Sequence, residues 1–415
     1  MELFDLSDKT ERVILVGVQE NDGDDTEESL QELAELAKTA GAEVVGTVIQ
    51  KRERIHPGTY VGKGKIDEIR TLLNALDATG IICDDELSPV QMNHLQQELE
   101  SKIMDRTLLI LDIFASRAVT KEGKIQVELA QLRYRAVRLV GLGSSLSRLG
   151  GGIGTRGPGE KKLEMDRRLI KERISQLKKE LEHVKKHREL LREGRKKDRV
   201  MTAAIVGYTN AGKSTLLNTL TDAGVLSEDK LFATLDPTTR LLELDGGQRI
   251  YLTDTVGFIR KLPHHLIEAF KSTLEEAKYA DVILHVVDAS NPQVEEQMFI
   301  VYETLRELGV KDKTIVTLFN KQDRLAGNEI LRDFKADYVL KISAHTGLGL
   351  DELKNTLEKI LIGNQIYIER VLDYKDAGML QLVRKYGQLI EEKYTENGIE
   401  IKARVPKDIY GRLGE

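Results

Sequence analysis

The chain has 415 residues, a formal net charge of −6, 31 % charged residues and a single cysteine, Cys83. This length is enough for two or three domains, and the longest apolar runs are too short to cross a bilayer. One cysteine cannot form an internal disulfide, and the acidic N-terminus lacks the zones of a secretory signal. We therefore expect a multidomain cytoplasmic protein without stable membrane insertion.

Residues 1–112 alternate apolar runs with helical patterns, which predicts a small parallel α/β domain. The apolar run RTLLILDIF takes the place of the last strand in this alternation. In YVGKGKIDEI, Lys63 and Lys65 open a helix and could hold a phosphate, with solvated loop lysines as the alternative. CDDEL at 83–87 could bind a metal, but an acidic loop after a strand that buries Cys83 is the simpler interpretation.

Residues 113–196 have the spacing of two long helices packed as an antiparallel coiled-coil hairpin. The apolar residues in heptad register are Ile125, Leu129, Leu132, Ala136 and Leu139, and then Leu163, Ile170, Ile174, Leu177, Leu181, Val184 and Leu191. Between them, SRLGGGIGTRGPGEKK at 147–162 contains a G-x-G-x-x-G pattern. This pattern binds dinucleotides where a strand turns into a helix. Here it follows a helix, so we interpret it as the hairpin tip.

The hairpin tip is locally basic although the whole chain is acidic. No Asp or Glu occurs between Glu128 and Glu160. Glycine-rich backbone offers amides and arginine offers charge, so this tip is a candidate contact for RNA phosphates, with a solvated loop as the alternative. The candidate RNA-contacting residues are Arg148, Arg156, Lys161 and Lys162.

Residues 197–363 form a second alternating α/β unit, which contains VMTAAIVGYTNAGKSTLLNTL. This segment places G-x-x-x-x-G-K-S between an apolar strand and a helix, as a phosphate-binding loop requires. Glycine lets successive N–H groups point at the phosphates, Lys213 reaches the β and γ oxygens, and Ser214 binds Mg²⁺. The candidate residues of this loop are Gly207, Tyr208, Thr209, Asn210, Ala211, Gly212, Lys213, Ser214 and Thr215.

Two later segments complete a predicted site for magnesium and the γ-phosphate. The predicted strand RIYLTDTVGF ends at Asp254, which can hold Mg²⁺ through water, and the Gly257 amide can meet the γ-phosphate. In FATLDPTTR, a threonine could complete the Mg²⁺ shell, and Thr234, Thr238 and Thr239 are all suited by chemistry. The candidate nucleotide contacts are Phe232, Ala233, Thr234, Leu235, Asp236, Asp254, Thr255, Val256 and Gly257.

The segments TIVTLFNKQDRL and LKISAHTGLG are predicted to read the base. Asp323 can accept hydrogen bonds from guanine N1–H and the N2 amine, which adenine lacks, and the Ala344 amide can donate to guanine O6. GTP and GDP are therefore the predicted ligands. The candidate residues are Asn320, Lys321, Gln322 and Asp323, followed by Ser343, Ala344 and His345.

Residues 364–415 are predicted to form a small α+β domain. Within EEKYTENGIEIKARV, Asn397 and Gly398 both tolerate positive φ, which is typical of a β-hairpin turn. The whole chain is then an α/β protein of four parts: a parallel α/β domain, a helical hairpin, a P-loop domain and this appendage.

The GTPase motifs, with GGIGTRGPGEKKLEMDRR and FATLDPTTR, resemble the HflX family of P-loop GTPases over nearly the whole chain. The resemblance implies a Ras-like domain in which Thr234 is the Mg²⁺-binding threonine, and Lys213, Thr234 and Gly257 are then the catalytic candidates. It also implies the large ribosomal subunit and its ribosomal RNA as partner, and a role in splitting or rescuing ribosomes under stress. The family's N-terminal domain has been connected with ATP, which adds interest to Lys63 and Lys65.

One position departs from the wider GTPase pattern. Phe258 follows Gly257, where Ras-like enzymes carry a glutamine that orients the attacking water. Phenylalanine cannot bond water, so we expect slow hydrolysis that a partner completes, while Phe258 itself could simply pack. His264 or His265 could supply the missing contact, or both could be surface residues. Three alternatives stay open: a subunit-assembly GTPase, an ATP-driven RNA remodeller and a switch for a protein partner. We expect a monomer.

Overall fold

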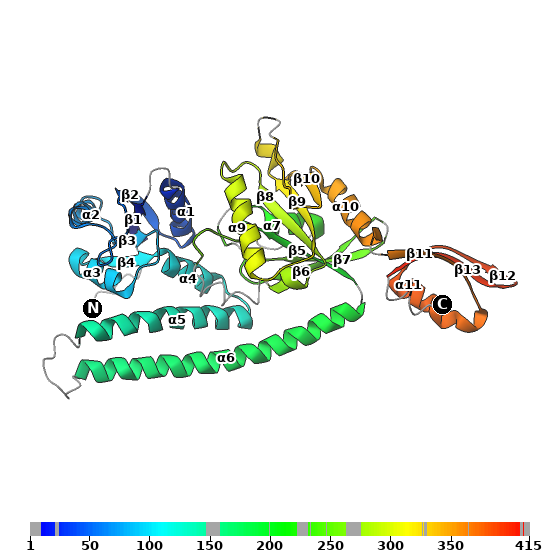
Figure 1. Cartoon of the computed structure of the whole chain (residues 1–415), viewed down its shortest axis with the longest axis horizontal. Coiled ribbons are helices and arrows are strands. Elements are labelled where there is room, and N and C mark those ends of the chain that lie inside the picture. The colour runs from blue at the N-terminus through cyan, green and yellow to red at the C-terminus, as the bar shows by residue number, and fades with distance from the viewer. Residues whose placement is uncertain are drawn as a thin grey trace, which may run out of the picture. The chain divides into compact units, whose positions relative to one another are not determined.

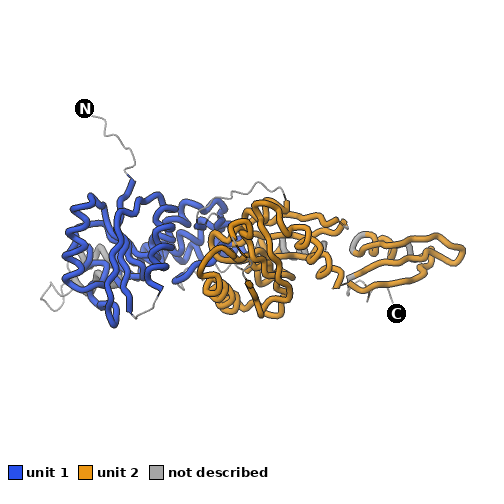
Figure 2. Tube along the Cα trace, turned by 90° about the horizontal axis from the view of Figure 1, so that it is seen from above, with its two compact units in different colours: residues 1–185, 228–236, 256–274 blue, residues 186–227, 237–255, 275–415 orange. Residues whose placement is uncertain are grey.

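The computed structural model describes residues 10–20, 25–146, 158–198, 200–221, 231–232, 234–245, 247–262, 275–325, 327, 330–363, 365–406 and 410. The chain divides into two compact units, coloured separately in Figure 2. The first comprises residues 1–185, 228–236 and 256–274, and the second comprises residues 186–227, 237–255 and 275–415. The segments that contain Thr234 and Gly257 therefore belong to the first unit, although the strands flanking them in sequence belong to the second.

A parallel sheet forms the centre of the N-terminal part of the chain (Figure 1). Its strands, in sheet order, are β2 (Glu43–Lys51), β1 (Arg12–Gln19), β3 (Gly80–Cys83) and β4 (Lys102–Asp105). The helices α2 (Lys63–Ala75) and α3 (Pro89–Leu99) share one apolar core with Val16 of this sheet. The helix α1 (Thr26–Thr39) packs over Gly17. Successive residues of a strand point to opposite faces of a sheet, so Gly17 and Val16 face opposite sides and α1 covers the other face. This layering confirms the predicted parallel α/β architecture.

The apolar run RTLLILDIF is a helix, so its prediction as a strand was wrong. It forms α4 (Arg106–Arg117), and the strand is the preceding segment, KIMD. The Asp105 carboxylate accepts a hydrogen bond from the Leu108 amide at 2.8 Å and so caps α4. Leu109, Ile110 and Phe114 are all buried, and an apolar run of this kind has no periodicity that separates a helix from a strand. Because α4 spans the predicted boundary at 112–113, the four-part division stays a prediction.

Two antiparallel helices follow, α5 (Lys121–Leu146) and α6 (Pro158–Asp198), with α5 alongside the N-terminal half of α6 (Figure 1). Their seam contains the predicted residues Ile125, Leu129, Leu132, Ile174, Leu177, Leu181 and Val184. Arg173 pairs with Glu128 at 2.7 Å, and Arg167 donates to the Leu139 carbonyl at 2.6 Å, which fixes the antiparallel direction. The hairpin tip at 147–157 lies outside the described residues.

The second unit contains a larger sheet, with strand order β10-β9-β8-β5-β7-β6. Its strands are β5 (Met201–Gly207), β6 (Thr238–Glu243), β7 (Arg249–Asp254), β8 (Val282–Asp288), β9 (Thr314–Asn320) and β10 (Tyr338–Lys341). β6 runs antiparallel to β7, and the other neighbouring strands are parallel. One face packs on α7 (Lys213–Thr221) and α10 (Leu350–Gly363), and residues of β8 and β9 pack with α9 (Val294–Glu307). This confirms the Ras-like α/β fold.

The C-terminal part of the second unit is a small antiparallel sheet of order β11-β13-β12. Its elements are β11 (Gln365–Leu372), the short 3-10 helix η2 (Tyr374–Asp376), α11 (Ala377–Tyr386), β12 (Gln388–Thr395) and β13 (Gly398–Pro406). Thr395 pairs with Gly398, whose φ is +134°, so the predicted hairpin turn is present. Neither α6 nor any other described helix combines the length and apolar character that spanning a bilayer requires.

Candidate nucleotide-binding site

The phosphate-loop glycines are positions where the backbone approaches other groups too closely for a side chain. A Cβ on Gly207, at the end of β5, would lie 2.2 Å from the Val286 carbonyl oxygen. A Cβ on Gly212, where φ is +97°, would lie 2.3 Å from Nδ2 of Asn320. The loop therefore closes tightly between β5 and α7, and this leaves backbone amides at a helix N-terminus to face phosphates.

Lys213 is held inside this loop. Its Nζ donates to the Tyr208 carbonyl oxygen at 2.7 Å, and the side chain is only 6 % exposed. Burial lowers the pKa of Lys213 to about 8, a shift that the carboxylate of Asp254 partly opposes. The ammonium is thus desolvated before any phosphate binds, which strengthens its attraction for an anion.

Ser214 and Asp254 bring oxygen ligands together beside the loop. The Ser214 hydroxyl donates to Oδ2 of Asp254 at 2.7 Å, and Asp254 ends the buried strand β7. Thr255 donates from Oγ1 to the Ile205 carbonyl at 2.7 Å and so fixes the chain after β7 to β5. A hydroxyl and a carboxylate next to a phosphate loop are ligands that fit Mg²⁺, which prefers oxygen and retains several waters.

The residues predicted to read the base are connected to the phosphate loop through one side chain. Asn320 donates from Nδ2 to the Ala211 carbonyl and accepts at Oδ1 from the Ala344 amide, both at 2.8 Å. The short 3-10 helix η1 (Gln322–Arg324) then presents Asp323. Ser343 donates to Oδ1 of Asp323 at 2.5 Å, and this hydrogen bond lowers the pKa of the Asp323 carboxyl. Asp323 therefore stays ionised and exposed, as a hydrogen-bond acceptor for guanine must be.

One residue of this arrangement was missed in the sequence. Asp288, at the end of β8, pairs with Nζ of Lys321 at 2.6 Å and so fixes the position of that side chain. The signal was available, since Asp288 is a carboxylate at the carboxyl end of a parallel strand in the same domain. Gln322 is likewise tied down, because it donates to the Phe319 carbonyl at 3.0 Å.

The structure separates the three candidate threonines. Thr238 and Thr239 begin β6, and the Thr239 hydroxyl is bonded to that of Thr253 at 2.9 Å. Thr234 lies before this strand in an irregular, half-buried segment. Thr234 is therefore the only one of the three that lies outside the strand.

Several candidates belong to the first unit, whereas the phosphate loop belongs to the second. Phe232, 2 % exposed, packs edge-on against Phe114 of α4 with ring centroids 4.7 Å apart. Phe258 is 1 % exposed, which agrees with a packing role. The candidates Ala233, Arg148, Arg156, His264 and His265 lie outside the described residues, and Lys161 and Lys162 belong to α6 with side chains that are not described.

At the N-terminal lysines, the amide of the residue that caps α2 is already occupied. The Gly62 amide donates to Oε1 of Gln50 at 2.8 Å, and Lys65 pairs with Glu68 at 2.8 Å. These contacts leave the predicted phosphate site at Lys63 and Lys65 without support.

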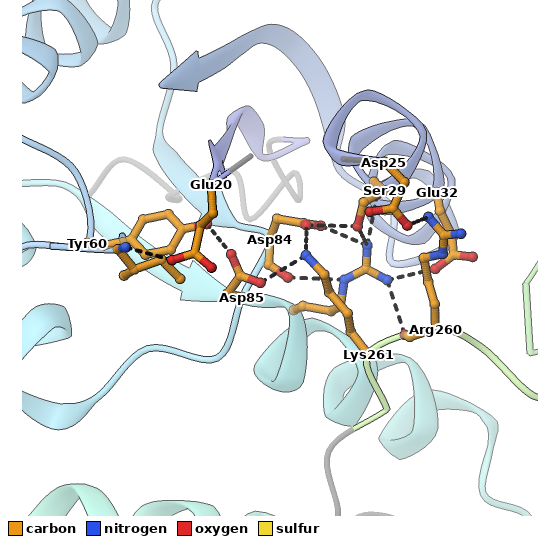
Figure 3. Close-up of polar contacts among 11 residues, drawn as sticks. Glu20, Asp25, Ser29, Glu32, Tyr60, Asp84, Asp85, Arg260 and Lys261 are labelled. Atoms are coloured by element: carbon orange, nitrogen blue, oxygen red, sulfur yellow. Dashed lines mark hydrogen bonds and ion pairs between the residues drawn. The ribbon is translucent and has the colours of Figure 1, made fainter. Parts of the chain in front are cut away.

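The residues that follow Gly257 are bound to the acidic end of β3 (Figure 3). Nζ of Lys261 lies 2.5 Å from Oδ2 of Asp84 and 2.9 Å from Oδ1 of Asp85. Arg260 pairs with Asp25 at 2.5 Å. The two aspartates of CDDEL are thus neutralised by cations of the chain. Within the described residues, no cluster of His, Cys, Asp and Glu side chains is placed to hold a metal.

The centre of this network is a buried ion pair. Arg106, 1 % exposed, donates to Oδ1 of Asp84 and to Glu32, each at 2.7 Å. Burial alone would raise the pKa of Asp84, but the charges of Arg106 and Lys261 outweigh burial and hold that pKa below its ordinary value. Asp84 is therefore a carboxylate at neutral pH, shared by α4 and the segment after Gly257.

The loop, the oxygen ligands and the base-reading residues define a P-loop GTPase. Three family models match in chain order: "GTP-binding GTPase N-terminal" over 27–115, "GTP-binding GTPase Middle Region" over 117–195 and "50S ribosome-binding GTPase" over 202–321. The chain belongs to the HflX family of GTPases, so it hydrolyses GTP.

Two relatives illustrate the match. The GTPase HflX of Lacrimispora saccharolytica is 67 % identical over 100 % of this chain and 98 % of its own length. The GTPase HflX of Escherichia coli is 45 % identical over 99 % and 97 %. Among solved structures, a GTP-binding protein from Sulfolobus solfataricus in complex with GDP is 26 % identical over 84 % of this chain and 98 % of its own, with a TM-score of 0.46.

We expect Asp84→Asn to lower the free energy of unfolding by about 3 kcal/mol at neutral pH, because Arg106 then loses one of its two buried carboxylates. The pKa of Asp84 is lower in the folded than in the unfolded state. Its stabilisation is therefore present above the ordinary Asp pKa of about 3.9 and is lost as the pH falls further. Urea unfolding of both proteins over a pH series measures this, and a difference independent of pH would contradict the assignment.

The depressed pKa of Lys213 predicts that nucleotide binding takes up a proton at high pH. Phosphates stabilise the ammonium, so affinity for GDP should be constant near pH 7 and about tenfold weaker near pH 9. Calorimetry in two buffers with different ionisation enthalpies should show close to one proton taken up per GDP near pH 9 and almost none near pH 7. Equal proton uptake at both values would rule out this role of Lys213.

Proposed function

We propose that this GTPase acts on the large ribosomal subunit and contacts its ribosomal RNA through the hairpin tip at 147–162. The observation that carries the proposal is the match of residues 202–321 to a 50S ribosome-binding GTPase model, within a chain that aligns with HflX GTPases from end to end. The α5–α6 hairpin supports it, since two long packed helices can present a basic tip at their far end.

For the GTPase reaction we assign roles to the residues of the site. Lys213 and the amides of 208–214 bind the β- and γ-phosphates, and the Gly257 amide meets the γ-phosphate. Ser214, Thr234 and, through water, Asp254 would hold Mg²⁺, which would neutralise phosphate charge when bound. Asp323 reads guanine. Thr234 and Gly257 would be ordered by the γ-phosphate and released after hydrolysis, so the nucleotide acts as a timer for subunit binding.

Phe258 explains why a partner is needed. A buried phenyl ring offers no hydrogen bond to the attacking water. Hydrolysis by the isolated protein is then slow, and a group that the large subunit supplies or repositions completes the site. Splitting or rescue of ribosomes under stress is the role that we assign, with subunit assembly as the competing role.

We expect Asp323→Asn to weaken GTP binding by at least tenfold and to favour xanthosine triphosphate, because an amide cannot accept from both guanine donors. Competition binding with GTP, xanthosine triphosphate and ATP measures the exchange of preference. Asp351→Asn, an exposed carboxylate in the first turn of α10, is the matched control and should keep wild-type preference. If the wild-type protein binds ATP as well as GTP, the assignment of Asp323 is wrong.

Large ribosomal subunits should accelerate single-turnover GTP hydrolysis severalfold, and the tip should be needed for this. Each phosphate contact contributes roughly 0.7 to 0.9 to the salt slope of log affinity. Changing Arg148 and Arg156 together to alanine should therefore weaken subunit binding, flatten its salt slope by roughly one to two units and leave GTP binding unchanged.

The control variant removes two positive charges from α6 instead of from the tip. Lys178 and Lys179 are exposed on α6, and changing both to alanine should leave the salt slope close to that of the wild type. Acceleration below about twofold would contradict the ribosomal proposal. A tip variant with wild-type affinity and salt slope would show that the tip is a solvated loop. Assays with intact ribosomes and with separate subunits distinguish splitting from assembly.

A further inference from the structure

The carboxylate of Asp236 binds the N-terminus of α5, the first helix of the hairpin. Its Oδ2 accepts from the amides of Val119 and Thr120 at 2.9 and 2.8 Å, and its Oδ1 accepts from the Thr120 hydroxyl at 2.5 Å. The same hydroxyl accepts from the Gly123 amide at 3.0 Å. Both carboxylate oxygens are therefore engaged by the helix, and a negative charge at this end is favoured by the helix dipole.

The lack of a side chain at Gly123 leaves room for the Asp236 carboxylate. A Cβ at this position would lie 2.5 Å from Oδ1 of Asp236 and 3.3 Å from its Cγ. Glycine is among the least favourable residues inside a helix, yet Gly123 lies in the first turn of α5. The close approach of Asp236 therefore explains why this helical position is a glycine, although helix propensity alone would favour another residue.

In the first unit, Thr234 lies between two residues whose side chains are held by other parts of the chain. Two residues before it, Phe232 adopts a φ of +55° and packs against Phe114 of α4. Two residues after it, Asp236 is bound to α5, and the intervening Leu235 is buried. The backbone on both sides of Thr234 is therefore set by α4 and α5.

We infer that Asp236 and Gly123 are positioning residues for GTP hydrolysis, acting on Thr234 through its backbone. The inference rests on the proposed role of Thr234 at Mg²⁺ and γ-phosphate. Asp236 then serves as the link between the nucleotide-dependent segment and the helix that leads to the tip, in place of the nucleotide contact predicted from its sequence neighbourhood. By linkage, anything that displaces the start of α5 also changes the segment around Thr234, and the reverse holds equally.

Gly123→Ala tests this without altering any residue of the nucleotide site. The added methyl group displaces the Asp236 carboxylate, while alanine favours the helix itself. We expect kcat for GTP hydrolysis to fall about tenfold, because small displacements of positioning groups have effects of this size or more. Affinity for GDP should stay within twofold of wild type, since GDP lacks the γ-phosphate that Thr234 serves.

The matched control is Gly378→Ala in α11, where a Cβ would meet open space, and it should retain wild-type kinetics. Asp236→Ala should reproduce the loss of kcat, and the double variant Gly123→Ala with Asp236→Ala should lose no more than either alone. Asp236→Asn, which keeps one carbonyl acceptor, should recover part of the activity. Urea unfolding of each variant confirms that the chain remains folded.

Two outcomes would overturn the inference. Wild-type kcat in Gly123→Ala, or losses that add in the double variant, would show that the contact does not position the reaction. Equal losses of GDP affinity and kcat would show a general structural effect. Thr234→Ala separates this test from the proposed function: if Thr234→Ala is inactive while Gly123→Ala is normal, only the positioning inference fails. Wild-type activity in Thr234→Ala would contradict both the proposed role of Thr234 and the positioning inference.

Discussion

The buried charge of Arg106 constrains the first unit more than any other group. A guanidinium that is 1 % exposed requires compensation, since transferring an ion from water costs several kcal/mol even after the protein relaxes. Asp84 and Glu32 supply it, and this brings the end of β3, α1 and the start of α4 to one point. Lys261 then takes the second oxygen of Asp84. The segment that follows Gly257 is therefore part of the charge balance of the N-terminal fold.

The nucleotide site of the second unit is organised by an uncharged side chain instead. Asn320 uses both ends of its amide, one toward the phosphate loop at Ala211 and the other toward the base loop at Ala344. Because the Gly212 backbone lies against the same amide, the spacing between phosphate and base is set inside the protein before a nucleotide arrives. Such preorganisation lowers the ordering cost of binding.

The sequence was sufficient where a motif specifies backbone geometry. Gly207, Lys213 and the strand ends at Asp254 and Asn320 could be placed because the phosphate loop requires a strand, a turn and a helix in that order. The heptad spacing was equally sufficient for the hairpin seam. The phosphate-loop motif and the heptad spacing each depend on residues that are close together in sequence, so one sequence is enough to recognise them.

The sequence misassigned one buried helix, and it did not reveal contacts between residues that are distant along the chain. RTLLILDIF was assigned to a strand because a buried helix with several apolar faces has no distinctive period. The carboxylate of Asp236, a residue predicted to contact nucleotide, accepts from donors that lie 116 and 117 residues earlier. The attachment of Lys261 to Asp84 spans 177 residues. No propensity or spacing rule encodes such pairings.

The interleaving of the two units in sequence has a consequence for any attempt to divide the chain. A fragment cut at the start of β5 would contain every GTPase motif, yet it would carry Phe232 without Phe114 and Asp236 without the Val119 and Thr120 amides that precede α5. Lys261 would lose Asp84 and Asp85. An apolar ring and several unmatched charges would then be exposed in the segments on either side of Thr234 and after Gly257. Kinetic constants of such a fragment would not apply to the whole chain, because these segments would lack the contacts that fix their conformation.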